Sequence, residues 1–273
     1  MGHGRGSPEP PTSKKDAGQA PTAMTNPLRA IFFDLGGTLF SNRDIPRVNT
    51  PALIEAAQRL GVEKEFDRVG LAYLQASRKV NDVYMSRPYY LHRDHFYDTY
   101  RAFAESFDRV ASDEFMDWFY EAQRSAMVGG LQLRDDCIDT LRALRDKGFT
   151  LSIVSNIDND FLEGMLHSLE LKPLFDHWIS SQAARSCKPD PKIFECALGQ
   201  AGCRAEEVIF VGDSRIHDIQ GARALGMTTV LLAEEGGVSH LDDEGFEAEP
   251  DHVISKLAEL VDWVEARLPR AGS

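Results

Sequence analysis

Residues 30–38 read Ala-Ile-Phe-Phe-Asp-Leu-Gly-Gly-Thr, an apolar run that ends on a carboxylate and continues into loop residues. Four consecutive apolar residues predict a short strand buried on both faces, as strands of a parallel sheet are. Asp34 then stands at the carboxyl end of a buried strand, where ligands bind in open α/β sheets. An aspartate after a strand is more often a turn or helix-cap residue, so the rest of the chain must decide between these interpretations.

From residue 130 onward the chain alternates between helical and strand patterns. Strands are expected at 149–154, 177–180, 207–211, 228–232 and 252–254, and helices at 134–147, 159–169, 191–201, 216–225 and 255–267. Such alternation is typical of βαβ units that build a parallel sheet. We therefore predict an α/β fold with an open, doubly wound parallel sheet.

Residues 46–129 have a different pattern, with apolar residues at helical spacing and no convincing strand. We expect an all-helical unit inserted after the first strand, with the α/β core formed by residues 28–45 and 130–273. Residues 1–27 are rich in Gly, Pro, Ser and Lys. Because they lack apolar periodicity, we expect them to form a disordered tail.

The composition limits the classes of partner. A net charge of −13 argues against nucleic acid or an anionic membrane as the main partner, since both need clustered Lys and Arg. No run of about 18 apolar residues predicts a membrane span. The four cysteines have neither CxxC nor zinc-ligand spacing, so we expect reduced thiols in a cytoplasmic protein. The sequence makes no prediction of oligomeric state.

Polar residues follow several of the expected strands. Ser155 and Asn156 follow the second strand, Lys188 lies in the loop before the helix at 191–201, and Asp213 and Asp218 follow the strand at 207–211. Each alone has an ordinary explanation as a cap, turn or solvated residue. Because the carboxyl ends of parallel strands meet at one edge of the sheet, we expect these side chains to gather around Asp34.

The order and spacing of these residues resemble the haloacid dehalogenase-like hydrolase superfamily. The first motif is matched by Asp34-Leu35-Gly36-Gly37-Thr38, the second by Ser155, the third by Lys188, and the fourth by Asp213 and Asp218. The resemblance implies a Rossmann-like core with a helical cap between the first and second motifs. It also implies a phosphatase of small phosphorylated metabolites, with Asp34 as the nucleophile of an aspartyl-phosphate intermediate.

The resemblance further implies a magnesium ion and a set of ligands for it. The ligands would be Asp34, the main-chain carbonyl of Gly36, Asp213 and Asp218, and the phosphoryl group would be bound by Ser155, Asn156, Lys188 and Gly37. The expected crowding of three carboxylates agrees with this, because carboxylates that share a pocket repel one another and raise their pKa values. Mg²⁺ relieves that repulsion and prefers oxygen ligands and phosphate.

The sequence departs from the family pattern at Gly36, where phosphatases carry a second aspartate as general acid and base. Three explanations stay open. The protein is a phosphatase whose substrate has a good leaving group, such as a sugar 1-phosphate or an acyl phosphate. Alternatively, it catalyses another reaction of an aspartate nucleophile, dehalogenase-like or phosphonatase-like. Thirdly, it is a binding or regulatory protein of low catalytic activity.

Three further features carry weaker hypotheses. Residues 87–95, Arg-Pro-Tyr-Tyr-Leu-His-Arg-Asp-His, lie in the expected cap and offer aromatic and cationic groups for substrate recognition. His217 lies between Asp213 and Asp218 and is a candidate for the missing acid. Cys187 adjoins Lys188, and a neighbouring cation can lower a thiol pKa, although close packing in a tight loop explains a cysteine there equally well.

Overall fold

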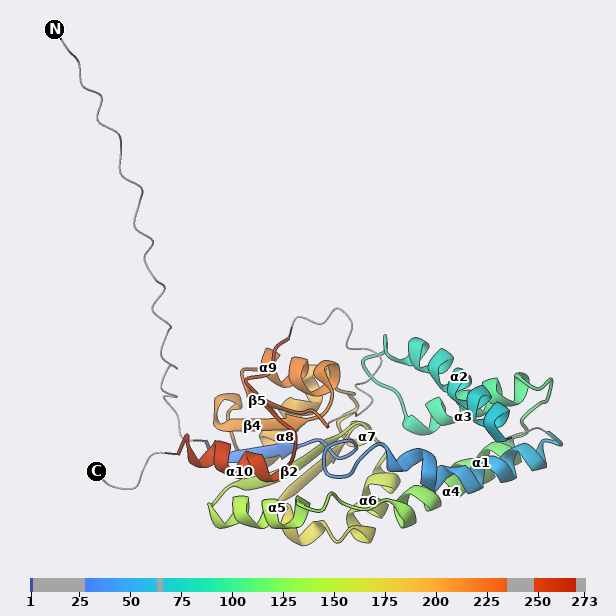
Figure 1. Cartoon of the computed structure of the whole chain (residues 1–273), viewed down its shortest axis with the longest axis horizontal. Helices are drawn as coiled ribbons and strands as arrows, with labels where there is room; N and C mark the ends of the chain where they lie inside the picture. Colours follow the sequence, from blue (N-terminus) through green and yellow to red (C-terminus); the bar gives the residue numbers. More distant parts are fainter. Residues whose placement is uncertain (2–27, 63–65, 235–247, 269–273) are drawn as a thin grey trace.

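The computed structural model describes Met1 and residues 28–62, 66–234 and 248–268. Its centre is a six-stranded sheet in which every paired strand is parallel, in the order β3-β2-β1-β4-β5-β6 (Figure 1). The strands are β1 Ala30–Phe33, β2 Thr150–Ser155, β3 His177–Ser180, β4 Val208–Gly212, β5 Thr228–Leu232 and β6 His252–Ile254. The predicted doubly wound parallel sheet is therefore confirmed.

Strand β1 lies between β2 and β4, and its four residues are apolar and buried, as a central strand requires. Phe33, its last residue, pairs with Ile153 of β2 on one side and with Val211 of β4 on the other. The chain places β2 and β3 on one side of β1 and then crosses to build β4, β5 and β6 on the other. The carboxyl end of β1 therefore lies at the point where the strand order reverses, which is where ligands bind in such sheets.

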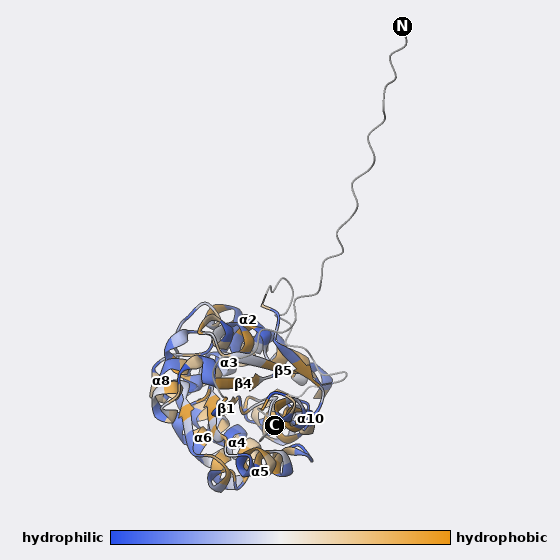
Figure 2. Cartoon of the chain, turned by 90° about the vertical axis from the view of Figure 1, so that its left-hand side faces the viewer, coloured by the Kyte–Doolittle hydropathy of each residue, from blue (hydrophilic) through white to orange (hydrophobic). Residues whose placement is uncertain are grey.

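Helices cover both faces of the sheet. They are α5 Cys137–Asp146, α6 Asn159–Ser168, α7 Ser181–Ala184, α8 Pro191–Ala201, α9 Gly221–Ala224 and α10 Ala258–Glu265, with short 3-10 turns at Lys172–Leu174 and Ala205–Glu207. One apolar cluster joins the sheet to α5, α6 and α10, and a second joins the opposite face to α8. Figure 2 shows the apolar strands β1, β4 and β5 between α8 and α10.

Four further helices come between β1 and α5. They are α1 Asp44–Arg59, α2 Phe66–Tyr84, α3 His92–Glu105 and α4 Asp113–Gly130, and we call them the helical unit. The unit has an apolar cluster of its own, in which the buried rings of Tyr100, Phe103 and Phe119 contact one another. The boundaries of core and cap stay predictions, and the expected tail over residues 1–27 lies outside the described residues.

One expected helix differs in kind. The segment predicted as a regular helix over 216–225 is a π-helix at Arg215–Gln220 (η3) that continues into the short α9. Such wide turns occur mostly at functional sites, and this one follows β4 directly. None of the helices in the described part of the chain has the length and apolarity that crossing a membrane requires.

Candidate active site

Asp34 continues the line of β1 into the site. Its main-chain N–H donates to the carbonyl of Val211 (2.9 Å), as though the strand ran one residue further. The side chain is buried, and its Oδ2 accepts a hydrogen bond from the Thr38 hydroxyl (3.5 Å). The strand and the turn after it therefore fix the position of the Asp34 carboxylate.

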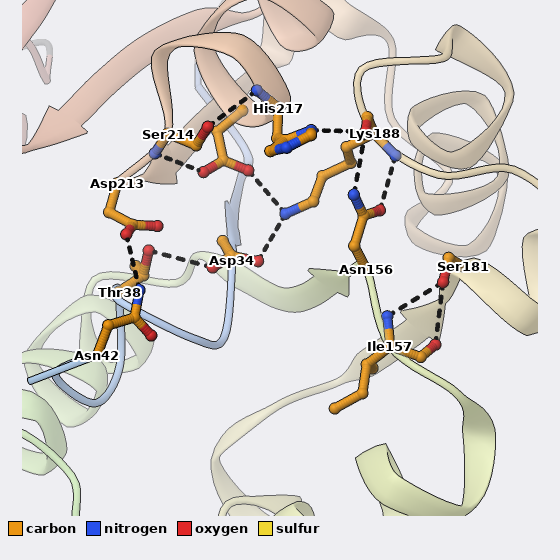
Figure 3. Close-up of polar contacts among 11 residues, drawn as sticks. Asp34, Thr38, Asn42, Asn156, Ile157, Ser181, Lys188, Asp213, Ser214 and His217 are labelled. Atoms are coloured by element: carbon orange, nitrogen blue, oxygen red, sulfur yellow. Dashed lines mark hydrogen bonds and ion pairs between the residues drawn. The ribbon is translucent and has the colours of Figure 1, made fainter. Parts of the chain in front are cut away.

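Lys188 joins two acidic residues from different strands. Its Nζ lies 2.6 Å from Oδ1 of Asp34 and 2.7 Å from Oδ1 of Asp218 (Figure 3). The lysine side chain is 2% exposed, so both ion pairs are shielded from water. Because buried charged hydrogen bonds are strong and directional, Lys188 fixes the two carboxylates relative to each other.

A third carboxylate, Asp213, completes an acidic cluster. Asp34, Asp213 and Asp218 each offer an oxygen, and these oxygens lie within 4.8 Å of one another. Asn42 donates a hydrogen bond to Oδ2 of Asp213 (3.3 Å). Carboxylate oxygens at this spacing suit a hard divalent cation such as Mg²⁺, and the repulsion among three acids beside a single lysine would fall when a cation binds.

Asp218 is held by the turn that follows β4. The N–H of Ser214 donates to Oδ2 of Asp218 (3.0 Å), and the Ser214 hydroxyl caps the π-helix by accepting from the N–H of His217 (3.1 Å). A Cβ at Gly212 would lie 2.3 Å from Cγ of Asp218. The glycine at the end of β4 therefore makes room for the acidic side chain against the backbone.

The ionisation of Asp34 reflects its surroundings. Burial raises the pKa of Asp34 to about 7; Lys188 opposes the rise, while Asp218 and Asp213 add to it. Burial alone would lower the pKa of Lys188, but attraction to Asp218 and Asp34 raises it above its ordinary value. The lysine therefore stays charged at neutral pH, while the acidic cluster favours the binding of a proton or another cation.

Asn156 acts on the main chain of Lys188. Its Oδ1 accepts from the Lys188 N–H (2.7 Å), and its Nδ2 donates to the Lys188 carbonyl (3.0 Å). Nδ1 of His217 lies 2.9 Å from the same carbonyl. Figure 3 shows these three residues converging from β2, the lysine loop and η3. Asn156 and His217 thus position Lys188 in addition to facing the cavity.

The predicted site residues share one cavity of about 220 Å³. Its lining includes Asp34, Gly36, Ser155, Asn156, Lys188, Asp213 and Asp218 from the prediction, together with Ser214 and His217 of the core. The helical unit contributes Asn81, Met85, Tyr90 and His92. Gly37 is not among the lining residues; its backbone φ of +82° and the 2.0 Å between a built Cβ and Oδ2 of Asp213 explain why this position is a glycine.

The residues at 87–95 divide between the cavity and the surface. Tyr90 and His92 line the cavity, whereas Arg93 is exposed and pairs with Asp117. Burial lowers the pKa of His92 to about 3, with repulsion from His95, His217 and Lys188 adding to the shift. His92 is therefore neutral at pH 7. At Cys187, burial raises the pKa of the thiol, which supports the packing role rather than reactivity.

Sequence reasoning missed Arg134. Its Nη2 donates to the carbonyl of Gly37 (2.6 Å), and its Nε donates to the carbonyl of Thr38 (2.9 Å). The same guanidinium lies 3.4 Å from Glu234, which also accepts from the Ser41 hydroxyl (2.9 Å). These contacts hold the loop that carries Asp34 at Gly37 and Thr38. No local motif indicates them, because the partners are about a hundred residues apart in sequence.

Comparison with known proteins places this geometry in a family. Residues 28–226 match the haloacid dehalogenase-like hydrolase family. The chain is 27% identical over 242 residues to a ribulose-1,5-bisphosphate 5-phosphatase of Halopiger xanaduensis, covering 86% of this chain and 98% of that protein. It is 30% identical over 238 residues to (S)-2-haloacid dehalogenase 1 of a Pseudomonas species, covering 86% and 96%.

Among solved structures, a HAD phosphatase from Thermococcus onnurineus superposes with a TM-score of 0.64 at 26% identity, covering 87% of this chain and 98% of that one. The parallel sheet, the acidic residues and lysine at its edge, and the match over residues 28–226 agree with one another. The chain belongs to the haloacid dehalogenase-like hydrolases.

Proposed function

We propose that the protein is a magnesium-dependent phosphatase of small phosphorylated metabolites. The observation that carries the proposal is the bridge from Lys188 to Asp34 and Asp218, with Asp213 beside them, at the switch point of the sheet. An acidic cluster with one buried lysine suits a cation and an anionic phosphoryl group together. The similarity to a phosphatase over 86% of the chain supports the same chemistry.

Each residue then has a role in phosphoryl transfer. Asp34 attacks phosphorus and forms an aspartyl-phosphate, which water hydrolyses. Lys188 offsets the charge between the attacking carboxylate and the phosphoryl oxygens, to which Ser155 and Asn156 donate hydrogen bonds. Asp34, Asp213, Asp218 and the carbonyl of Gly36 would hold Mg²⁺, which supplies charge neutralisation on the phosphoryl oxygens. The helical unit acts as the cap, closing the cavity with Tyr90 and His92.

The absence of an acid at position 36 indicates the kind of ester cleaved. The main-chain carbonyl of Gly36 remains available as a ligand, so only the side-chain proton transfer is missing. General acid catalysis is worth roughly 10²–10⁴-fold in rate. We infer that the preferred substrates have good leaving groups, which depart without protonation. Sugar 1-phosphates and acyl phosphates are substrates of this kind.

Dehalogenase chemistry is the second candidate because a relative at 30% identity is a dehalogenase. Dehalogenases of the superfamily carry an aromatic residue at the position of Gly36 and usually lack the Gly-Asp pair that this chain has at Gly212-Asp213. Phosphonate-cleaving members use a cap lysine; of the two lysines in the expected cap, Lys79 of α2 does not line the cavity, and Lys64 lies outside the described residues. Both departures favour the phosphatase.

The decisive experiment measures release of phosphate from a panel of phosphorylated metabolites, with Mg²⁺ and with a chelator. We expect turnover that requires Mg²⁺ and that Asp34→Asn abolishes, because the amide is not a nucleophile. The same panel extended with 2-haloacids and phosphonates tests the alternatives. Activity indifferent both to the metal and to Asp34→Asn would refute the proposal, and halide release would support the dehalogenase.

Gly36→Asp tests the missing acid. A Cβ at this position would lie 3.3 Å from the ring Cζ of Phe40, and a small movement of that ring would accommodate it. We expect the aspartate to raise kcat for alkyl phosphates by roughly tenfold or more while changing acyl phosphates little. Gly36→Asn is the matched control, since it adds the same volume without a proton. An equal effect of both variants would show that the acid is not the missing function.

A further inference from the structure

A second cavity adjoins the catalytic one. It has a volume of about 200 Å³ and shares Met85, Tyr90, Lys188 and His217 with the first. The two cavities therefore lie on either side of the same four residues, next to the acidic cluster. If the proposed phosphatase activity holds, the compartment is where the leaving group of the substrate lies.

The compartment is built where the helical unit meets the core. One wall is the segment 84–90, which ends α2 and leads toward α3, and the other is the loop 187–190. The N–H of Cys187 donates to the carbonyl of Pro88 (2.8 Å), and its thiol donates to the carbonyl of Tyr90 (3.7 Å). These two contacts join the two walls of the compartment.

The lining is mainly apolar and aromatic, and it carries three charged side chains. The ammonium group of Lys188 forms ion pairs with Asp34 and Asp218. Asp190 caps α8, and its Oδ1 accepts hydrogen bonds from the Ser186 hydroxyl (2.7 Å) and the Lys192 N–H (3.1 Å). Two of the three charges therefore have structural partners, which leaves Arg87 to be explained.

Arg87 is held in place without an acidic partner. Its guanidinium lies 4.1 Å from the centre of the Tyr84 ring, and the Tyr84 hydroxyl donates to Asp98 (2.7 Å), which fixes the ring. In the described part of the chain no carboxylate lies within ion-pair distance of Arg87, whereas nearby Arg101 pairs with Asp98. Arg87 is exposed to solvent and lines the second cavity while it stacks on Tyr84, and its planar donors match a carboxylate or phosphate of a ligand.

We propose that Arg87 binds a second anionic group of the substrate, a carboxylate or a second phosphate on the leaving group. This proposal rests on the proposed function and adds its substrate class: a small phosphate ester or anhydride with an anion at its far end. The apolar walls contact the carbon chain between the two anions. The catalytic compartment supplies chemistry, and Arg87 supplies selectivity.

Matched pairs of substrates test the proposal. Both pairs keep the same anomeric phosphate as the leaving site: one is glucuronic acid 1-phosphate against glucose 1-phosphate, which differ in a carboxylate, and the other is glucose 1,6-bisphosphate against glucose 1-phosphate, which differ in a phosphate. We expect the enzyme to favour the doubly anionic member of at least one pair by roughly tenfold or more in kcat/KM. The pair that shows the preference identifies which anion the compartment takes.

Arg87→Gln should remove that preference. We expect KM for the doubly anionic member to rise roughly tenfold or more, with kcat and the constants for the singly anionic member unchanged. Arg78→Gln is the matched control, because Arg78 is exposed on α2, nine residues before Arg87, and lies outside both cavities. A wild-type enzyme without preference in either pair, or an Arg87→Gln loss equal for both members, would overturn the proposal.

Equilibrium binding of the same pairs to Asp34→Asn separates this proposal from the phosphatase itself. Binding that prefers the doubly anionic member and depends on Arg87, without hydrolysis by the wild type, would contradict the phosphatase and support the anion site. Hydrolysis without any preference in turnover or binding would contradict the anion site and support the phosphatase.

Discussion

The two adjacent glycines in the loop after β1 differ in how much space each position leaves for a side chain. At Gly37 the backbone φ is +82°, and a side chain would collide with Asp213, so the acidic cluster requires glycine there. At Gly36 a Cβ would lie 3.3 Å from the ring edge of Phe40 and 3.6 Å from Oδ1 of Asn42, with no collision. The departure from the family pattern at position 36 is therefore a change of chemistry, and the fold does not demand it.

Asp34 makes stability depend on pH when no metal is bound. Its pKa of about 7 in the folded protein exceeds the ordinary 3.8, because burial disfavours the charge. Between these values the folded state holds more protons than the unfolded state, so this group makes stability fall as pH rises from about 4 to about 7. We expect the unfolding free energy of Asp34→Asn, measured by urea unfolding in chelator, to increase relative to that of the wild type as pH rises across that range. The increase should be a few kcal/mol at most.

The comparison of the two proteins at each pH isolates the contribution of Asp34 from other titrating groups. At pH 4 the wild-type carboxyl is neutral, and the two proteins should have similar unfolding free energies. A difference that stays constant from pH 4 to pH 8 would contradict the raised pKa of Asp34.

At the scale of elements, the loop between β1 and α1 is fixed from both sides. Lys188 binds Asp34 from the loop before α8, and Arg134, just before α5, binds the carbonyls of Gly37 and Thr38. The π-helix after β4 brings Asp218 back to the same lysine. Three separate connections of the sheet therefore fix the position of Asp34.

Arg134→Met should displace the loop that carries Asp34. Two carbonyls lose their charged donor, and small displacements at a reacting centre cost rates of roughly 100-fold. We expect kcat on the best substrate of the panel to fall by about that factor with KM nearly unchanged, and stability to fall by about 1–3 kcal/mol. Arg142→Met, at an exposed residue of α5 that pairs with Asp139, is the control. Equal loss in both variants would show that Arg134 has no positioning role.

At the scale of the whole molecule, Asp158 joins the core to the helical unit. It lies directly before α6 and is buried, yet its carboxylate caps α3 of the other part. Its Oδ1 accepts from the N–H of His92 (3.0 Å), and its Oδ2 accepts from the N–H of Arg93 (2.8 Å). Because His92 lines the cavity, the same contact that joins the two parts also fixes the wall opposite Asp34.

Asp158→Ala should loosen that junction. Loss of a helix cap costs about 1 kcal/mol, and a negative charge at a helix N-terminus adds some tenths more. We expect a lower thermal midpoint and faster hydrogen exchange at the amides of His92 and Arg93, with little change in the strands. Asp160→Ala removes an exposed carboxylate two residues away, which accepts from the N–H of Phe161 in α6 (2.9 Å), and should leave exchange at His92 and Arg93 unchanged. Unaltered exchange at His92 in Asp158→Ala would contradict the capping role.

The sequence by itself determined the sheet and the set of residues at its edge. Buried strands are local apolar runs, and β3, β5 and β6 begin and end where the pattern predicted. The carboxyl ends of parallel strands share one edge of the sheet. The sequence alone therefore predicts that Asp34, Lys188, Asp213 and Asp218 lie close together. The family resemblance then added the metal and the nucleophile as expectations.

Only the tertiary structure decided how these residues are held and what faces them. Asn156 binds the main chain of Lys188 32 residues away, and Arg134 binds carbonyls 96 and 97 residues away. Along residues 87–95, Tyr90 and His92 face the cavity while Arg93 does not. A local pattern of apolar residues predicts which residues are buried, because burial repeats with the period of a strand or helix. It does not predict which distant residue a single side chain contacts, because that depends on how separate elements pack.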